Sequence, residues 1–92
     1  MPSIFKVFGY SVFFWSNENN EPIHVHISKG NPSPNATKYW ITKNGGCIQA
    51  NNNSKIPVSD LNELEQIISA QFFVICSAWK EHFKTDQIKF YC

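Results

Sequence analysis

The stretch EPIHVHI, residues 21–27, alternates polar and apolar side chains and contains two of the three histidines of the chain, His24 and His26. Successive side chains of a β-strand point to opposite faces, so both histidines share one face. Val25 and Ile27 then lie on the other face, where they can enter a core. This alternation predicts a strand, and it leaves open whether the histidines form a site or only the polar face of that strand.

The sequence around this stretch predicts further strands. β-Branched and aromatic residues on both sides of Gly9 indicate an N-terminal hairpin. After a polar loop, the strand that contains the histidines is expected over residues 24–28. A fourth strand over residues 36–42 and a short one over residues 47–50 are expected on either side of a hairpin turn at residues 44–46.

The last third of the chain has a helical period. Ser59 is the expected N-cap, with Asp60 in the first turn. The period fits one long helix or two helices with a break near residues 70–71. Residues 72–76 are apolar nearly all round, which indicates that more than one face is covered, by the sheet and by a partner protein. The apolar residues that recur at three- and four-residue steps are Leu61, Leu64, Ile68, Phe72, Ile75, Trp79 and Phe83.

Together these elements predict an α+β fold, an antiparallel sheet of four or five strands with one or two C-terminal helices packed on one face. A chain of 92 residues is expected to form a single domain, because two smaller cores would bury too little apolar surface. We expect the sheet in residues 1–50, the helices in residues 59–84 and a tail or short extra strand in residues 85–92. The expected core is Ile4, Phe8, Val12, Phe14, Val25, Ile27, Leu64, Ile68, Ile75 and Trp79.

Composition and charge argue against several classes of function. The chain is 42% hydrophobic and 15% aromatic, which is typical of a folded protein. A net charge of +1 and the absence of arginine count against tight nucleic-acid binding. Glu63, Glu65 and Glu81 make the helical region acidic, so DNA binding is unexpected.

The three cysteines are odd in number and widely spaced, and we expect reduced thiols. The first residues lack the features of a signal peptide, and no apolar run is long enough to span a bilayer. The expected location is therefore the cytoplasm, without a membrane as a partner.

The histidine pair has several interpretations. His24 and His26 could face water or bond to loop groups on the polar side of a strand. They could bind a divalent metal such as zinc, with a further ligand from Glu21, Cys47 or His82. They could also act as acid and base, as in metal-independent RNA cleavage, or bind a ligand without chemistry.

His82 and Cys47 also have ordinary structural roles. A histidine beside the core stripe of a helix is more often a hydrogen-bonded boundary residue than a ligand. Cys47 is expected to be a small buried hydrophobe, because no basic residue is fixed beside it. Trp79 is expected in the core.

Five short motifs set this sequence apart, namely MPSI at residues 1–4, FGY at 8–10, WSN at 15–17, EPIHVH at 21–26 and WKEHF at 79–83. With these motifs the chain resembles the small prokaryotic family catalogued as domain of unknown function family 4160. The resemblance runs from Met1 to about Lys84. The chain departs from the family pattern at Ile23, where the family usually has a second proline, and at residues 86–92, which continue past its usual end.

The resemblance implies where a site would lie, although the family has no established activity. Its polar signature falls on Ser16, Asn17, Glu21, His24 and His26. The genes of the family often stand beside another small gene, an arrangement similar to toxin–antitoxin pairs, which implies a bacterial protein with a small protein partner.

Two functions follow. The first is a protein-binding component of a toxin–antitoxin-like pair, whose partner is the product of the neighbouring gene or a second copy of the chain. The apolar excess of residues 72–76 motivates it. The second is a small nuclease or metal-dependent hydrolase in which His24 and His26 are the reactive groups and RNA is a possible substrate. Glu21 would orient one ring, and Lys29 or Lys38 would hold phosphate.

Overall fold

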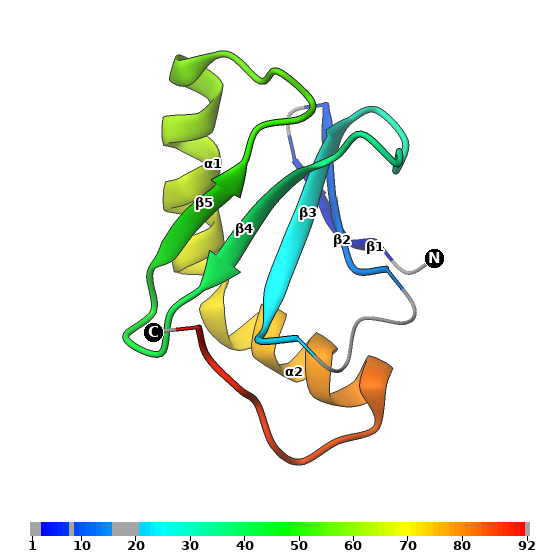
Figure 1. Cartoon of the computed structure of the whole chain (residues 1–92), viewed down its shortest axis with the longest axis vertical. Helices are drawn as coiled ribbons and strands as arrows, with labels where there is room; N and C mark the ends of the chain where they lie inside the picture. Colours follow the sequence, from blue (N-terminus) through cyan, green and yellow to red (C-terminus); the bar gives the residue numbers. More distant parts are fainter. Residues whose placement is uncertain (1–2, 8, 16–20, 92) are drawn as a thin grey trace.

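The computed structural model describes residues 3–7, 9–15 and 21–91 of the chain. The strands form one antiparallel sheet in the order β1-β2-β3-β4-β5, so each strand pairs with its neighbours in the sequence. The expected α+β class is confirmed (Figure 1). The elements in this part of the chain are β1 (Ser3–Val7), β2 (Tyr10–Phe13), β3 (His24–Lys29), β4 (Thr37–Ile41), β5 (Cys47–Asn51), α1 (Val58–Ala70) and α2 (Phe72–Phe83).

Two of the strand connections depend on glycine. Gly9, between β1 and β2, has a φ of 88°, and Gly45, between β4 and β5, has a φ of 91°. A side chain would be strained in this left-handed region, whereas glycine adopts it readily. Both hairpins were expected from the sequence, and the strands end within one or two residues of the expected positions.

The core lies between the sheet and the two helices. Val25 and Ile27 of β3 are buried there, as the alternation in the sequence predicts. Of the remaining expected core residues, Ile4 is only partly buried, and Phe8 lies outside the described residues. The others that are buried as expected are Val12, Phe14, Leu64, Ile68, Ile75 and Trp79.

The start of α1 differs from the expectation. The helix begins at Val58 with Pro57 as its N-cap residue, and no side chain caps it. Ser59 lies inside the first turn and is exposed, so the predicted N-cap is wrong. The Pro57 carbonyl accepts the first helical hydrogen bond, from the Leu61 N–H at 2.9 Å, so the helix starts before Ser59. Asp60 does lie in the first turn, where it accepts a 2.7 Å hydrogen bond from the Tyr10 hydroxyl.

The helical region is two helices that meet at Gln71. The Gln71 backbone N–H donates to the carbonyls of Ile67 and Ile68, which ends α1 with a short turn. α1 lies along the side of the sheet formed by β4 and β5, and α2 crosses the end at which β3 begins (Figure 1). None of the described helices is long and apolar enough to cross a membrane.

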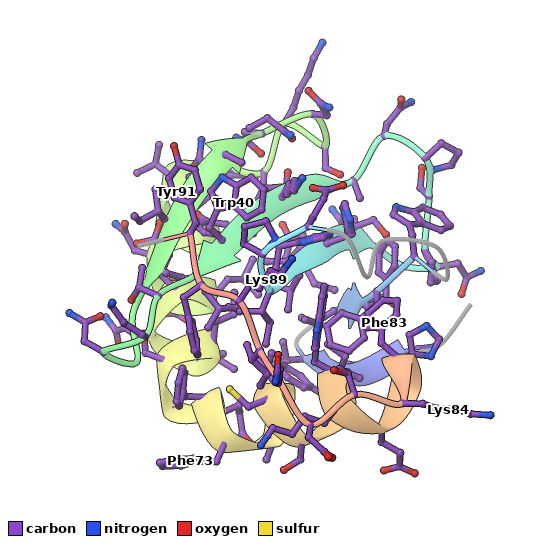
Figure 2. All side chains as sticks on the ribbon, turned by 60° about the horizontal axis from the view of Figure 1, so that its bottom comes forward. Trp40, Phe73, Phe83, Lys84, Lys89 and Tyr91 are labelled. Carbon is purple, nitrogen blue, oxygen red and sulfur yellow. The ribbon has the colours of Figure 1, made fainter. Side chains whose placement is uncertain are left out.

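Residues 85–91 form no helix or strand. They run from the end of α2 back over the start of β3, where the Ile23 N–H donates to the Lys89 carbonyl at 2.8 Å. The Tyr91 ring then stacks on Trp40 of β4, with 5.0 Å between centroids and 7° between planes. Figure 2 shows these two rings side by side.

Leu64 of α1 has no exposed surface and packs in the core, so Leu64→Ala is expected to lower the free energy of unfolding by about 2–5 kcal/mol through lost burial and a cavity. Urea denaturation followed by circular dichroism measures this. The control is Val58→Ala, at a 72% exposed position of the same helix, which should change stability by less than about 0.5 kcal/mol. Equal losses in both variants would contradict the packing described.

Candidate functional site

The histidine pair at the start of β3 is buried. His24 has 0% of its surface exposed and His26 has 7%. Their ring centroids are 5.0 Å apart and the planes are perpendicular. The two side chains share one face of the strand, as expected, but that face does not open to water.

Aromatic rings surround both histidines. His24 lies between Trp40 of β4, at 5.6 Å, and Trp79 of α2, at 5.4 Å between ring centroids. His26 stacks on Phe13 of β2 at 5.7 Å and lies 6.1 Å from Trp15. In the sheet Phe13 pairs with His26 and Trp40 pairs with His24, so these two rings lie on the same face as the histidines.

A loop carbonyl fixes the orientation of His24. Its Nδ1 lies 2.8 Å from the Pro22 carbonyl oxygen. A carbonyl can only accept, so Nδ1 is the donor and carries a proton. Hydrogen bonding to loop groups was one of the interpretations of the pair, and the structure shows it for this ring.

Glu21 and Lys38 form an ion pair. Lys38 Nζ lies 2.7 Å from Glu21 Oε1 and 4.2 Å from the centroid of the Trp40 ring. Within the described residues the partner of Glu21 is thus a lysine, and not the imidazole that it was expected to orient. Lys38, expected to hold phosphate, is half-buried in this ion pair, whereas Lys29 is exposed at the end of β3.

The proposed metal ligands do not converge. Among the residues that the structure describes, no three His, Cys, Asp or Glu side chains are placed to hold one metal ion. Cys47 pairs with Ile41 on the core side of the sheet, opposite the histidine pair. His82 packs against Phe14 and Phe83, with ring centroids at 6.0 and 4.5 Å. The residues present therefore do not fit a zinc site of three or four protein ligands.

His82 is half-buried, and its Nε2 makes no hydrogen bond within the described residues. His82 was expected to lie at the boundary of the core and to form a hydrogen bond there. It does lie at the boundary, but the expected hydrogen bond of Nε2 is not seen. The other two residues of the family's polar signature, Ser16 and Asn17, lie outside the described residues.

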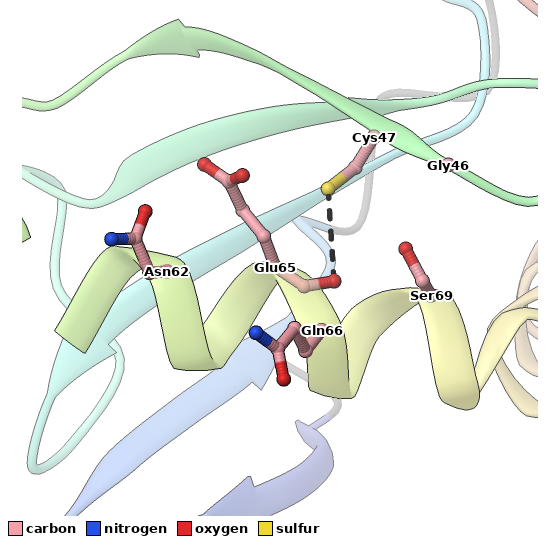
Figure 3. A pocket seen from close by; sticks show the side chains of 6 residues that line it. All are labelled: Gly46, Cys47, Asn62, Glu65, Gln66 and Ser69. Carbon is pink, nitrogen blue, oxygen red and sulfur yellow. Dashed lines mark hydrogen bonds between the residues drawn. The ribbon is translucent and has the colours of Figure 1, made fainter. Parts of the chain in front are cut away.

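A second feature, which the sequence did not reveal, is an open groove of about 660 Å³ between β5 and α1 (Figure 3). In it, Glu65 Oε2 accepts a 2.7 Å hydrogen bond from the Tyr39 hydroxyl. Cys47 Sγ lies 4.0 Å from the Glu65 carbonyl oxygen. The residues that line the groove are Gly46, Cys47, Asn62, Glu65, Gln66 and Ser69.

Two side chains at the groove, Cys47 and Tyr39, have raised pKa values. Burial raises the pKa of the Cys47 thiol to about 11, and the negative charge of Glu65 adds to this. Burial and the hydrogen bond to Glu65 also raise the pKa of Tyr39. Cys47 is therefore a poor nucleophile and a poor metal ligand near neutral pH, although it is half-buried and not fully buried as expected.

The hydrogen bond from His24 to the Pro22 carbonyl predicts the tautomer of the His24 ring. Its neutral ring should be the tautomer with the proton on Nδ1, which a long-range ¹H–¹⁵N spectrum of the imidazole identifies. His82, whose Nε2 makes no hydrogen bond within the described part of the chain, serves as an internal comparison. A His24 ring with the proton on Nε2 would show that the Pro22 contact is wrong.

The raised pKa of Cys47 predicts slow alkylation. At pH 8 the folded protein should react with iodoacetamide at Cys47 roughly 100-fold more slowly than the urea-unfolded chain does, because so little thiolate is present. Peptide mapping by mass spectrometry measures the rate at this residue. Glu65→Gln removes the negative charge that helps to raise the pKa of Cys47, so this variant should react faster than the unchanged protein. Equal alkylation rates of Cys47 in the folded and unfolded states would show that the pKa of Cys47 is not raised by folding.

Comparison with known proteins agrees with the resemblance seen in the motifs. No curated protein and no solved structure matches the chain. A family model described as Domain of unknown function (DUF4160) matches residues 9–80, more than half of the chain. The matched region runs from the β1–β2 turn into α2 and includes both histidines of β3. The chain therefore belongs to the DUF4160 family.

Proposed function

We propose that the protein is a protein-binding component of a toxin–antitoxin-like two-gene pair, and that it binds the small protein encoded by the neighbouring gene. The observation that carries the proposal is the apolar surface of α2, where Phe73 is 81% and Val74 48% exposed. Phe73 points away from the body of the protein (Figure 2). Burial of one phenylalanine side chain contributes about 1.5–3 kcal/mol, enough to make it an anchor for a partner.

The fold itself does not need these two side chains. α2 contributes Ile75 and Trp79 to the core, and Phe72 packs at its edge. Residues 72–76 were expected to be covered by the sheet and by a partner protein, and within the described residues only Ile75 of that run is fully buried. Their exposure is what a free binding surface requires.

The chemistry of this surface fits an apolar protein partner. The first two turns of α2, residues 72–79, contain no charged side chain, and the next two residues, Lys80 and Glu81, have opposite charges. Such a surface offers nothing to attract phosphate. The frequent pairing of family genes with a second small gene supports a partner from that source.

The alternative function, a nuclease or hydrolase, receives less support. General acid–base catalysis needs an imidazole within hydrogen-bond reach of the substrate. His24 has no exposed surface and His26 very little, and Lys38 is engaged by Glu21. A substrate would have to displace an aromatic ring before it could reach either histidine.

The test is calorimetric titration of the purified protein with the purified product of the neighbouring gene. Phe73→Ser should weaken binding at least about tenfold, because a central apolar anchor is lost. Both variants in this test change an exposed side chain, so the fold should stay intact. The control is Val58→Ser, which removes a 72% exposed apolar side chain from the start of α1 and should bind like the unchanged protein.

Two results would overturn the proposal. The first is the same affinity for Phe73→Ser, Val58→Ser and the unchanged protein. The second is absence of binding together with a dimer, seen by sedimentation, that Phe73→Ser dissociates, since the occupant of the surface would then be a second copy of the chain.

A further inference from the structure

β5 is the last strand of the sheet, and in the described part of the chain β4 is its only strand partner. Every second residue of such an edge strand directs its backbone N–H and C=O away from the sheet. Proteins usually protect an open edge with lysine, proline or irregular pairing. β5 contains neither charge nor proline, whereas β1, at the other edge, carries Lys6.

Irregular pairing does limit the open edge. Gln49 and Asn51 pair with adjacent residues of β4, so Ala50 has no partner residue opposite it. A bulge of this kind ends a regular edge. The stretch that can accept another strand therefore lies within residues 46–49. Both backbone groups of Gly46 already bond to Thr42, so the groups that point outward belong to Cys47 and Gln49. Gly46 and Cys47 line the groove between β5 and α1 (Figure 3).

The groove would receive the side chains of an added strand. Side chains alternate between the faces of a strand, so every second one would point toward α1. There it would meet Asn62, Glu65 and Gln66, which line the groove from the helix side. An added strand thus finds both backbone groups at the edge and room for its side chains.

The charge of the groove indicates which side chain fits. Glu65 accepts a hydrogen bond from Tyr39, a neutral donor, and within the described residues no lysine forms an ion pair with it. α1 also carries Asp60 and Glu63 but no lysine or arginine. A cationic side chain would balance this charge, whereas a second copy of the chain would bring three more carboxylates.

We propose that the open edge of β5 binds an extended segment of a partner protein as a sixth strand, with a lysine or arginine side chain in the groove paired with Glu65. Backbone hydrogen bonds supply affinity in this mode of binding, and the groove supplies selectivity. The site is separate from the Phe73 surface on α2. The strand-binding proposal can therefore be correct or wrong independently of the proposed two-gene function.

The test uses ¹⁵N-labelled full-length protein and a seven-residue peptide of alternating threonine and valine with one central lysine. Addition of the peptide should shift the amide signals of residues 46–49 and of Glu65. A peptide of the same sequence with N-methylated backbone should leave these signals in place, because it lacks the donors that an added strand needs. A peptide with central glutamate should bind about fivefold more weakly.

Two matched variants separate the charge of the groove from the charge of the helix. Glu65→Gln keeps an acceptor for the Tyr39 hydroxyl, so the fold should stay intact, and it should abolish the preference for lysine over glutamate. Glu63→Gln changes the net charge by the same amount at an exposed position outside the groove, and should keep the preference.

Several results would overturn the proposal. The first is that the N-methylated peptide binds as tightly as the unmethylated one. The second is that the peptide shifts the amide signals of Phe73 and Val74 and not those of β5. The third is that no amide signal shifts at a millimolar concentration of peptide. A dimer that forms through β5 without any peptide would also overturn it, since the edge would then belong to a second copy. Failure of the neighbouring gene product to bind leaves the peptide result unaffected.

Discussion

The rest of the structure depends on the burial of β3 on both of its faces. On one side, Val25 and Ile27 pack into the core below the helices. On the other, His24 and His26 are enclosed by aromatic rings. A polar ring in such a place needs a fixed hydrogen bond, because an imidazole that loses water without gaining a partner is costly. The Pro22 carbonyl meets this need at His24 and so ties the loop before β3 to the start of the strand.

The break at Gln71 separates two helices that run in different directions. Because the helical region turns there, α1 stays beside β4 and β5 while α2 crosses the end of the sheet. Phe73 lies on the outside of α2, and the groove lies between α1 and β5. The two surfaces differ in chemistry, since one is apolar and uncharged and the other contains the carboxyl group of Glu65.

Much of the fold could be predicted from the sequence, because strand and helix periods and the turns at Gly9 and Gly45 are local signals. The burial of the histidine pair could not. A period of two tells which side chains share a face, but it does not tell what covers that face. Partners distant in the sequence were also missed, namely Lys38 for Glu21 and Tyr39 for Glu65. The N-cap residue was also missed, because the Pro57 carbonyl already accepts the first helical hydrogen bond and the helix begins before Ser59.

The order of the strands in the sheet, which is also their order in the sequence, has a consequence for the growing chain. Each strand pairs with the one made just before it, so the hairpins can form early and at low entropic cost. The helices that cover the core face are synthesised after all five strands. Until α1 and α2 leave the ribosome, Val12, Val25 and Ile27 have no helix to pack on, and the nascent sheet is at its most vulnerable to aggregation.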